Sequence, residues 1–294
     1  MEFFFQYLVA GITYGTIYAI VAIGFNIIYN ATGIINFAQG EFVMLGGMAA
    51  VTLSRFLPLP MAILGAVAIT MVVGAVIEIL FIRWLRGPSV LRMIIITIGV
   101  SILVREIALH VWGESVRALP YFTGSSVSSI NLGSVYVSPQ VLWVVGVSAV
   151  AVGALSAFFS YTMLGRQMRA CAANRDAARL CGVNVSNMVT LSFMLSAAIG
   201  ALGGAVVCPI TYVHYDSGTP LAIKGFTVAI LGGLGNSMAA VGAGMILGIL
   251  ESFSIWVLPA AYKEVVSISI LLLILFVRPS GIFGSAEASR LKEF

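Results

Sequence analysis

"YLVAGITYGTIYAIVAIGFNIIY", residues 7–29, places 23 residues without a charged side chain near the start of the sequence. As an α-helix this stretch would be about 35 Å long, which is enough to cross the ~30 Å hydrocarbon core of a membrane. It is too long for the apolar region of a secretory signal peptide, and no basic segment precedes it. The stretch therefore predicts a first membrane-spanning helix.

Similar apolar runs recur along the 294 residues of the chain. Of these residues 60% are hydrophobic and only 9% are charged, and the mean hydropathy is +1.08, whereas soluble domains contain about 25% charged residues. The alternation of period two that marks a membrane β-barrel is absent. We predict an all-α fold, a polytopic transmembrane helical bundle that forms a single domain over residues 1–294. The further expected spans are 36–55, 59–82, 93–112, 139–162, 188–213, 238–258 and 262–279.

The net charge of +4 does not indicate a nucleic-acid partner. Cytoplasmic loops of membrane proteins are rich in Lys and Arg, so the positions of these residues indicate the membrane topology instead. Three basic groups assign the connection after the third span, the loop 163–187 and the C-terminus to the cytoplasm. Segment 113–138 then becomes an external loop. The basic residues are Arg83, Arg86, Arg92, Arg166, Arg169, Arg175, Arg179, Arg278, Arg290 and Lys292.

This orientation requires a further crossing between the sixth expected span and residue 238. The apolar piece 225–235 is only about 16 Å long as a helix, and "LGGLGNS" (Leu231–Ser237) interrupts it. We expect a short broken helix at or below mid-depth, which is tolerated only where protein or a water-filled cavity surrounds it. Whether the chain crosses the membrane eight or nine times stays open.

Ionisable residues lie in or close to several expected spans. Such groups are costly in a membrane and usually face other protein or a pathway. Arg105 and Glu106 are adjacent, so they point about 100° apart on a helix and need partners on other helices; Glu251 is one candidate. A buried ion pair that fixes helix register and a role in substrate or proton transfer are both open. The residues are Glu41, Glu78, Arg105, Glu106 and Glu251.

The second expected span starts with the polar stretch "IINFAQGEF" (Ile34–Phe42). Asn36, Gln39 and Glu41 lie beside Gly33 and Gly40, which predicts a loosely wound helix start. Such a segment suits the lining of a pore better than a lipid-facing surface, and a plain interfacial helix start is the alternative.

Enzyme signatures are absent from the sequence. His110 and His214 are the only histidines, each alone near a span end, and no H-E-x-x-H, G-x-S-x-G or G-x-x-x-x-G-K-[ST] motif occurs. We therefore predict no catalytic residues, no metal, no cofactor and no ATP-binding loop on this chain. The three cysteines are expected to be free thiols, since two of them lie in the loop assigned to the cytoplasm.

The loop "GRQMRACAANRDAARLCGVN" (Gly165–Asn184) is unusually basic for this chain. Asn174 is a good N-cap, Asp176 complements the helix dipole, and Gly182 suits a C-terminal stop. These residues predict a helix of about two turns from Arg175 to Cys181. Because so short a helix is marginal alone, we expect it to dock on the membrane surface or on another protein, and its small alanines favour a protein groove.

The same loop resembles the cytoplasmic loop of permease subunits in the branched-chain amino acid ABC transporter family. Three further blocks match in the same order: "NFAQGEFVMLGGMAA" (Asn36–Ala50), "TIGVSILVRE" (Thr97–Glu106) and "KGFTVAILGGLGNSMAAVGAGMILGILE" (Lys224–Glu251). The resemblance covers nearly the whole chain and is strongest to the shorter of two permease types. Gln39 is a departure, since many relatives have His there.

The resemblance implies a second permease subunit, in either a heterodimer or a homodimer. It also implies two cytosolic ABC ATPases, an extracytoplasmic substrate-binding protein, and a location in the bacterial inner membrane among its lipids. It also implies that the arginine loop couples the permease to the ATPases. The expected coupling residues are Gly165, Arg166, Arg169, Ala173, Asn174, Arg175, Asp176, Ala177, Arg179 and Gly182. For the translocation pathway we predict Asn36, Gln39, Gly40, Glu41, Thr97, Gly232, Gly233 and Gly235.

We therefore predict a permease of an ATP-driven importer for branched-chain or other hydrophobic amino acids. A permease of the same type for urea or short amides is the alternative. A channel or ion-coupled carrier is a further rival, for which Glu41, Arg105 and Glu251 would be the working charges; such a protein would transport without ATP.

Overall fold

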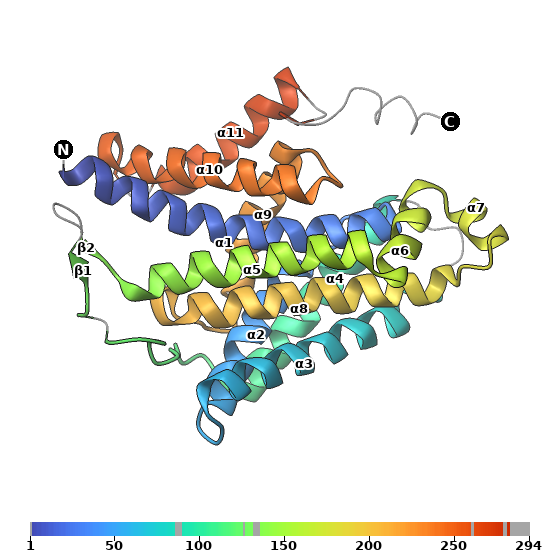
Figure 1. Cartoon of the computed structure of the whole chain (residues 1–294), viewed down its shortest axis with the longest axis horizontal. Helices are drawn as coiled ribbons and strands as arrows, with labels where there is room; N and C mark the ends of the chain where they lie inside the picture. Colours follow the sequence, from blue (N-terminus) through green and yellow to red (C-terminus); the bar gives the residue numbers. More distant parts are fainter. Residues whose placement is uncertain are drawn as a thin grey trace.

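The computed structural model describes residues 2–85, 90–125, 127–131, 136–259, 262–278 and 281–282. Most of its helices run side by side along the longest axis of the molecule (Figure 1). The strands lie at one end, called the β end below, and α6 and α7 lie at the other, called the α7 end. The elements are α1 (Glu2–Thr32), α2 (Gln39–Leu53), α3 (Leu59–Ile77) with the π-helical turn η1 (Glu78–Ile82), α4 (Val90–Trp112), β1 (Ile130–Asn131), β2 (Tyr136–Val137), α5 (Pro139–Tyr161), α6 (Met163–Ala173), α7 (Arg175–Leu180), α8 (Val185–Thr211), α9 (Gly218–Gly232), α10 (Ser237–Val257) and α11 (Lys263–Val277).

Six stretches of these helices are long and apolar enough to cross a membrane, which confirms the expected polytopic helical bundle. They are α1, α3 with η1, α4, α5, α8 and α10. The other two expected spans, 36–55 and 262–279, contain helices of only 15 residues, α2 and α11. At about 22 Å each, these two helices are shorter than the hydrocarbon core.

Helix α1 forms the centre of the bundle and packs against α10, α8 and α9. Its contact with α10 depends on small residues: a Cβ added to Gly15 would lie 2.7 Å from the Gly244 oxygen, and one on Gly11 would lie 2.8 Å from Ile249. These glycines let the two backbones approach closely, as small residues do at membrane helix interfaces.

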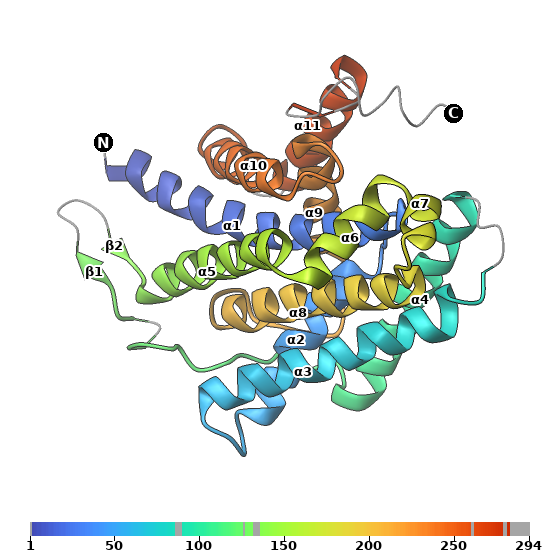
Figure 2. The ribbon, with the colours of Figure 1, turned by 45° about the vertical axis from the view of Figure 1, so that its right-hand side comes forward.

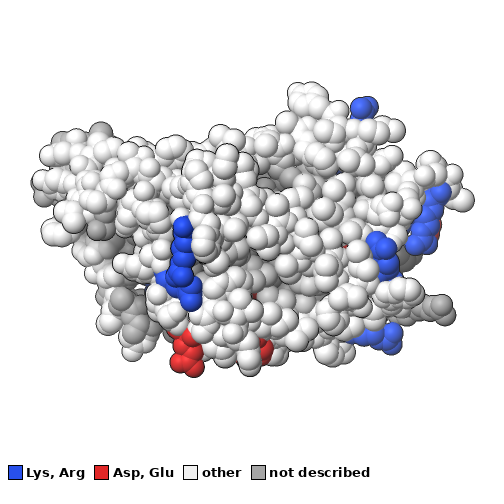
Figure 3. All heavy atoms as spheres, turned by 90° about the horizontal axis from the view of Figure 1, so that it is seen from below, with Lys and Arg blue, Asp and Glu red and all other residues white. Residues whose placement is uncertain are grey.

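The peripheral helices turn apolar side chains outward. In an 18-residue apolar stretch of α1, 72% of the residues are buried. The corresponding share is 22% in α4 and 17% in α5, so α4 and α5 line the outside of the bundle. Viewed from the side of α3, the surface is mostly free of charged side chains, and several Lys and Arg side chains gather towards the α7 end (Figure 3). This distribution is that of a protein surrounded by lipid.

Two short helices lie inside the bundle, and each follows a non-helical segment. Segment 33–38 returns from the end of α1 and leads into α2, and segment 212–217 returns from the end of α8 and leads into α9. Helix α9 lies against α1 and α11, and α2 lies against α8 and α3 (Figure 2). We call α2 and α9 the half-helices.

The short helix expected at 225–235 is present as α9, but its bounds differ from the expected ones. Helix α9 begins at Gly218, and its end at Gly232 turns directly into α10. Asn30, near the end of α1, donates a hydrogen bond to the Gly235 oxygen (2.8 Å), so the turn after α9 lies beside that end of α1. The irregular backbone inside the bundle precedes α2 and α9 instead, because their glycine-rich starts pack against other helices.

Helix α3 ends in the π-helical turn η1, where the Glu78 carboxylate is buried. It accepts a hydrogen bond from Thr190 of α8 (2.7 Å) and pairs with Arg83 (3.4 Å). The intramembrane charge expected at Glu78 thus joins α3 to α8 at the α7 end.

The connection from α4 to α5 corresponds to the expected external loop 113–138 and lies at the β end. Ile130 pairs with Val137 in its short antiparallel sheet. Arg117 exchanges backbone hydrogen bonds with Val213, after α8. Arg86, Arg290 and Lys292, which contributed to the expected orientation, lie outside the described residues.

Candidate functional site

The two half-helices begin at the same place in the interior. A Cβ on Gly40 would overlap the Gly218 oxygen, and one on Gly218 would lie 2.8 Å from the Gly40 oxygen, so only glycine fits on both sides. Helix α2 runs from this point to the β end and α9 runs to the α7 end. The junction of α2 and α9 thus brings together two helix N-termini, each of which carries a partial positive charge.

Glu41 lies in the first turn of α2 with only 1% of its surface exposed. One carboxylate oxygen, Oε1, accepts a hydrogen bond from Ser101 of α4 (2.9 Å). The other, Oε2, has no hydrogen-bond partner among the described residues and lies 2.6 Å from the position of a Cβ on Gly218. Glu41 therefore places a free carboxylate oxygen at the start of α9.

Arg105 lies one helical turn beyond Ser101 on α4 and reaches the same junction. Its Nη1 donates to Asp216 (3.0 Å) and to Thr219 (3.3 Å). Glu251, the partner considered from the sequence, is therefore the wrong one; Asp216 was not recognised because it lies in a loop rather than in a span. Glu106 is exposed on α4, so Arg105 and Glu106 diverge as their spacing predicts.

Glu251 belongs to a second polar cluster, between α1, α9, α10 and α11. Its fully buried carboxylate pairs with Lys224 of α9 and with Lys263 of α11 (3.6 Å). Lys224 also donates to the Tyr18 hydroxyl (3.3 Å), and the Lys263 ammonium lies 3.8 Å from the centroid of the Tyr14 ring. In the sequence, Lys224 and Lys263 each lie at the start of an apolar stretch. A lysine at such a position was the sequence signal that could have revealed this cluster.

The other polar residues predicted for the pathway, Gln39, Asn36 and Thr97, each make different contacts. Gln39 is fully buried and exchanges hydrogen bonds with Ser196 of α8, so it joins α2 to α8. Asn36 accepts from the Ala38 amide (3.1 Å), while its buried Nδ2 has no partner among the described residues. Thr97 is buried and donates to Ile94 within α4 (3.0 Å).

The predicted glycines 232, 233 and 235 form the turn between α9 and α10, away from the junction. Gly233 and Gly235 have φ of +90° and +95°, which favours glycine. Asn26 accepts from the Gly235 amide (3.0 Å) and Asn30 donates to its oxygen. These glycines therefore hold the turn against the last turns of α1.

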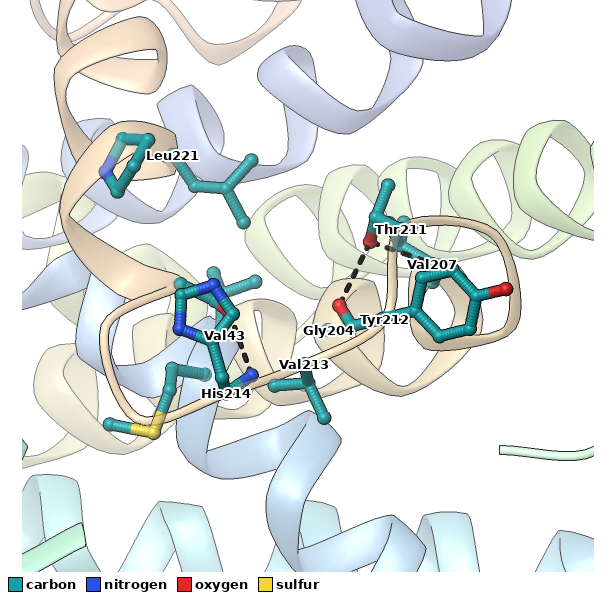
Figure 4. Close-up of a pocket in the computed structure, with 11 residues that line it drawn as sticks. Val43, Gly204, Val207, Thr211, Tyr212, Val213, His214 and Leu221 are labelled. Carbon is teal, nitrogen blue, oxygen red and sulfur yellow. Dashed lines mark hydrogen bonds between the residues drawn. The ribbon is translucent and has the colours of Figure 1, made fainter. Parts of the chain in front are cut away.

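A cavity of about 200 Å³ opens beside the first turns of both half-helices (Figure 4). Val43 of α2, Leu221 of α9 and the segment around His214 enclose it, and Ser217 contributes a hydroxyl. Tyr212, at the start of this segment, has φ +58°, a conformation that is uncommon for a residue other than glycine. The strained turn and the cavity together mark the β-end side of the junction.

At the α7 end, the arginine loop folds largely as its sequence predicts. Asn174 caps α7 by accepting from the amides of Asp176 and Ala177 (both 3.0 Å). Gly182 has φ +80°, and the hydrogen bonds from Gly182 to Arg179 and from Val183 to Ala178 close the helix in the pattern of a Schellman motif. The expected two-turn helix is confirmed, and α6 precedes it as a separate helix.

Most of the predicted coupling residues are exposed on α6 and α7. The exceptions are Gly165, where a Cβ would overlap the Phe158 oxygen of α5, and Arg175. Arg175 is half-buried and donates to the Ala31 oxygen at the end of α1 (2.8 Å); burial is the main cause that lowers the pKa of its guanidinium. The exposed residues are Arg166, Arg169, Ala173, Asn174, Asp176, Ala177, Arg179 and Gly182.

The family model described as "Branched-chain amino acid transport system / permease component" matches residues 7–275. The chain belongs to this permease family. The permease is 34% identical to the high-affinity branched-chain amino acid transport system permease protein BraD of Pseudomonas aeruginosa, with 98% of each chain covered. Its identity to the corresponding protein LivH of Escherichia coli K12 is also 34%, again over 98% of each chain.

The fold of the permease is similar to that of a solved structure, PsaBC from Streptococcus pneumoniae in complex with Fab. The TM-score is 0.52 at 15% sequence identity, with 99% of this chain and 96% of that chain covered. The similarity supports the fold alone. The family match makes the permease a membrane component of a branched-chain amino acid ABC transport system.

Proposed function

We propose that this permease is one of two membrane subunits in an ATP-driven importer with two cytosolic ATPases, and that its α7 docks in a cleft of one of these ATPases. The observation that carries this proposal is the geometry of α7: a helix of six residues, capped at both ends, with Leu180 90% exposed. So short a helix is marginal by itself, and a partner groove that covers Leu180 would stabilise it.

The docking surface would be the outer side of α6 and α7. Ala173, Ala177 and Leu180 supply a small apolar area, and Arg166, Arg169, Asp176 and Arg179 supply charges around it. In this proposal Gly165 and Gly182 shape the loop rather than contact the ATPase. Added bulk on the apolar area should therefore impair docking more than the loss of one peripheral charge.

Arg175 would transmit a movement of α7 to the membrane-spanning helices. Its hydrogen bond to Ala31 joins α7 to the end of α1. The same end of α1 holds the α9–α10 turn through Asn26 and Asn30, and it continues into segment 33–38, which leads to α2. A displacement of α7 on ATP binding could thus reach both half-helices through α1.

The pathway would pass the junction of α2 and α9. Irregular backbone at this depth is stable where it lines a cavity or packs on protein, and transporters use the starts of broken helices as substrate sites. Asn36, Gly40, Glu41 and Thr97 would lie on or near this pathway, while Gln39, Gly232, Gly233 and Gly235 would hold the half-helices in place. The second permease subunit would complete the enclosure.

The α7 end would lie in the cytoplasm together with the C-terminus, and the β end would receive substrate from an extracytoplasmic binding protein at the bacterial inner membrane. The names of the relatives support branched-chain amino acids as the substrate. A permease of the same type for urea or short amides is the alternative.

The test is uptake by the complete importer, meaning both permease subunits, the ATPases and the loaded binding protein in proteoliposomes. Ala177→Trp should reduce ATP-dependent leucine uptake at least about ten-fold, because the indole cannot fit a groove shaped for alanine. Ala149→Trp makes the same change on the exposed face of α5 and should leave uptake unchanged. Wild-type uptake by Ala177→Trp would refute the docking assignment.

A further inference from the structure

The junction of the half-helices carries both signs of charge in a confined space. Glu41 Oε2 is buried without a partner among the described residues. Arg105 supplies a positive charge at the same junction, and the N-termini of α2 and α9 supply partial positive charges beside Glu41. A buried carboxylate oxygen without a partner is costly, so its retention calls for a cation that pairs with it during the transport cycle.

We propose that this junction binds the zwitterionic backbone of an α-amino acid, with the ammonium on Glu41 and the carboxylate on Arg105. This inference rests on the proposed import function and specifies the chemistry of its pathway. Urea and short amides carry neither charge and would leave Glu41 unpaired, so the proposal favours amino acids over them.

The two charged groups of the proposed site lie beside the same face of α4. Ser101 holds Glu41, and Arg105 lies four residues further along α4, so the two α4 side chains share one helix face about 6 Å apart. In this proposal, an α-amino acid bridges Glu41 and Arg105 through an ammonium and a carboxylate that are joined by one carbon.

The present partner of Arg105 can be exchanged for a substrate carboxylate. The side chain of Arg105 is 28% exposed and that of Asp216 is 47% exposed, and partly exposed ion pairs contribute little to stability. The hydrogen bonds of Arg105 to Asp216 and Thr219 use Nη1, and a guanidinium has further donors. Met44, Ser217 and Leu221, which follow closely on the residues of the site in sequence, line a cavity on the β-end side of the junction. The result is a site that can bind a zwitterion and release it.

Transport tests the charge on Glu41. In the complete importer, Glu41→Gln keeps the shape of the side chain and removes its charge, and leucine uptake should fall at least about ten-fold. Glu41→Asp, which keeps the charge, should retain more uptake than Glu41→Gln. Glu106→Gln is the matched control, since Glu106 lies on the same helix but is exposed, and it should behave as wild type. Wild-type uptake by Glu41→Gln would show that Glu41 acts as a neutral group and would overturn the proposal.

Binding is measured separately by thiol protection at the junction. Thr219→Cys is introduced into the assembled importer with Cys181→Ser to lower background labelling, and its reaction with a small methanethiosulfonate is followed. Millimolar leucine should slow the reaction several-fold, whereas urea and 4-methylpentanamide should not. The protection should disappear in Glu41→Gln and persist in Glu106→Gln.

Equal protection by the neutral amide, or no protection by leucine, would overturn the zwitterion site. The import proposal fails by a different result, namely a wild-type importer that takes up no amino acid with ATP. The two failures are therefore distinguishable.

Discussion

Arg175 differs from its neighbours in the arginine loop because its side chain turns inward. The sequence groups it with Arg166, Arg169 and Arg179 as a cytoplasmic charge, and those three are exposed. Arg175 instead donates to Ala31 at the end of α1. A carbonyl at a helix C-terminus has no partner within its own helix, and a guanidinium satisfies it well.

Replacement of Arg175 should separate ATP hydrolysis from transport. Arg175→Gln removes a charged hydrogen bond of about 1.5–3 kcal/mol, so we expect about a five-fold or greater fall in leucine transported per ATP hydrolysed. Arg175→Lys, which can still donate to Ala31, should recover part of the loss. The measurement is uptake and ATPase activity in the same proteoliposomes.

Arg55→Gln, an exposed change at the β end, serves as the control for Arg175. An unchanged ratio of transport to hydrolysis in Arg175→Gln would show that the bond to Ala31 takes no part in coupling.

Among the elements, α7 is the one whose form follows most directly from its own residues. Its N-cap, its first-turn acidic residue and its C-terminal glycine all lie within nine residues, from Asn174 to Gly182. The half-helices are the opposite case. Gly40 and Gly218 are far apart in sequence, and only the packed bundle shows that each leaves room for the other.

The left-handed conformation of Gly182 gives a prediction for α7. A Cβ at this position would meet no atom within 4 Å, so Gly182→Ala acts through backbone strain alone, at a cost of roughly 1–2 kcal/mol. Amide hydrogen exchange in α7 should accelerate about ten-fold.

Gly146→Ala is the matched change for Gly182→Ala, since its added Cβ also meets nothing within 4 Å. Gly146 lies within α5, where alanine is favoured over glycine. Equal exchange in wild type and Gly182→Ala would contradict the strained C-terminal stop.

The whole molecule divides its three cysteines between interior and surface. Cys171 and Cys208 are buried, and Cys181 at the end of α7 is exposed. Burial raises the pKa of the Cys171 thiol, which disfavours the reactive thiolate. This contrast makes Cys181 a natural reporter of whether α7 is covered in the assembled importer.

Maleimide should therefore label Cys181 in the isolated permease and leave Cys171 and Cys208 unmodified. Assembly with the ATPases should protect Cys181 if they cover α7, and denaturation should expose all three thiols. Peptide mass spectrometry after labelling distinguishes the sites. Labelling of Cys181 at the same rate with and without the ATPases would argue against α7 as the docking helix.

Local residue patterns were enough to predict the membrane class, the capped α7 and the divergence of Arg105 from Glu106. Of the eight spans expected from the sequence, six are helices long enough to cross a membrane, and the other two contain helices of only 15 residues. The length of an apolar stretch, a helix cap and helical spacing each depend on residues within a few turns of one another. They can therefore be recognised in the sequence without knowledge of which elements pack together. The family resemblance in four ordered blocks was likewise visible before folding, and the match over residues 7–275 confirms it.

Only the tertiary structure decided where the chain turns back inside the bundle and which charges meet. Segments 33–38 and 212–217 lead into two helices that pack closely at Gly40 and Gly218, and Asp216 meets Arg105 across more than a hundred residues. Such pairings depend on packing between elements and leave no periodic signal in sequence. For that reason the positions of Glu251, Lys224 and Lys263, and the opposed starts of α2 and α9, emerged from the folded bundle alone.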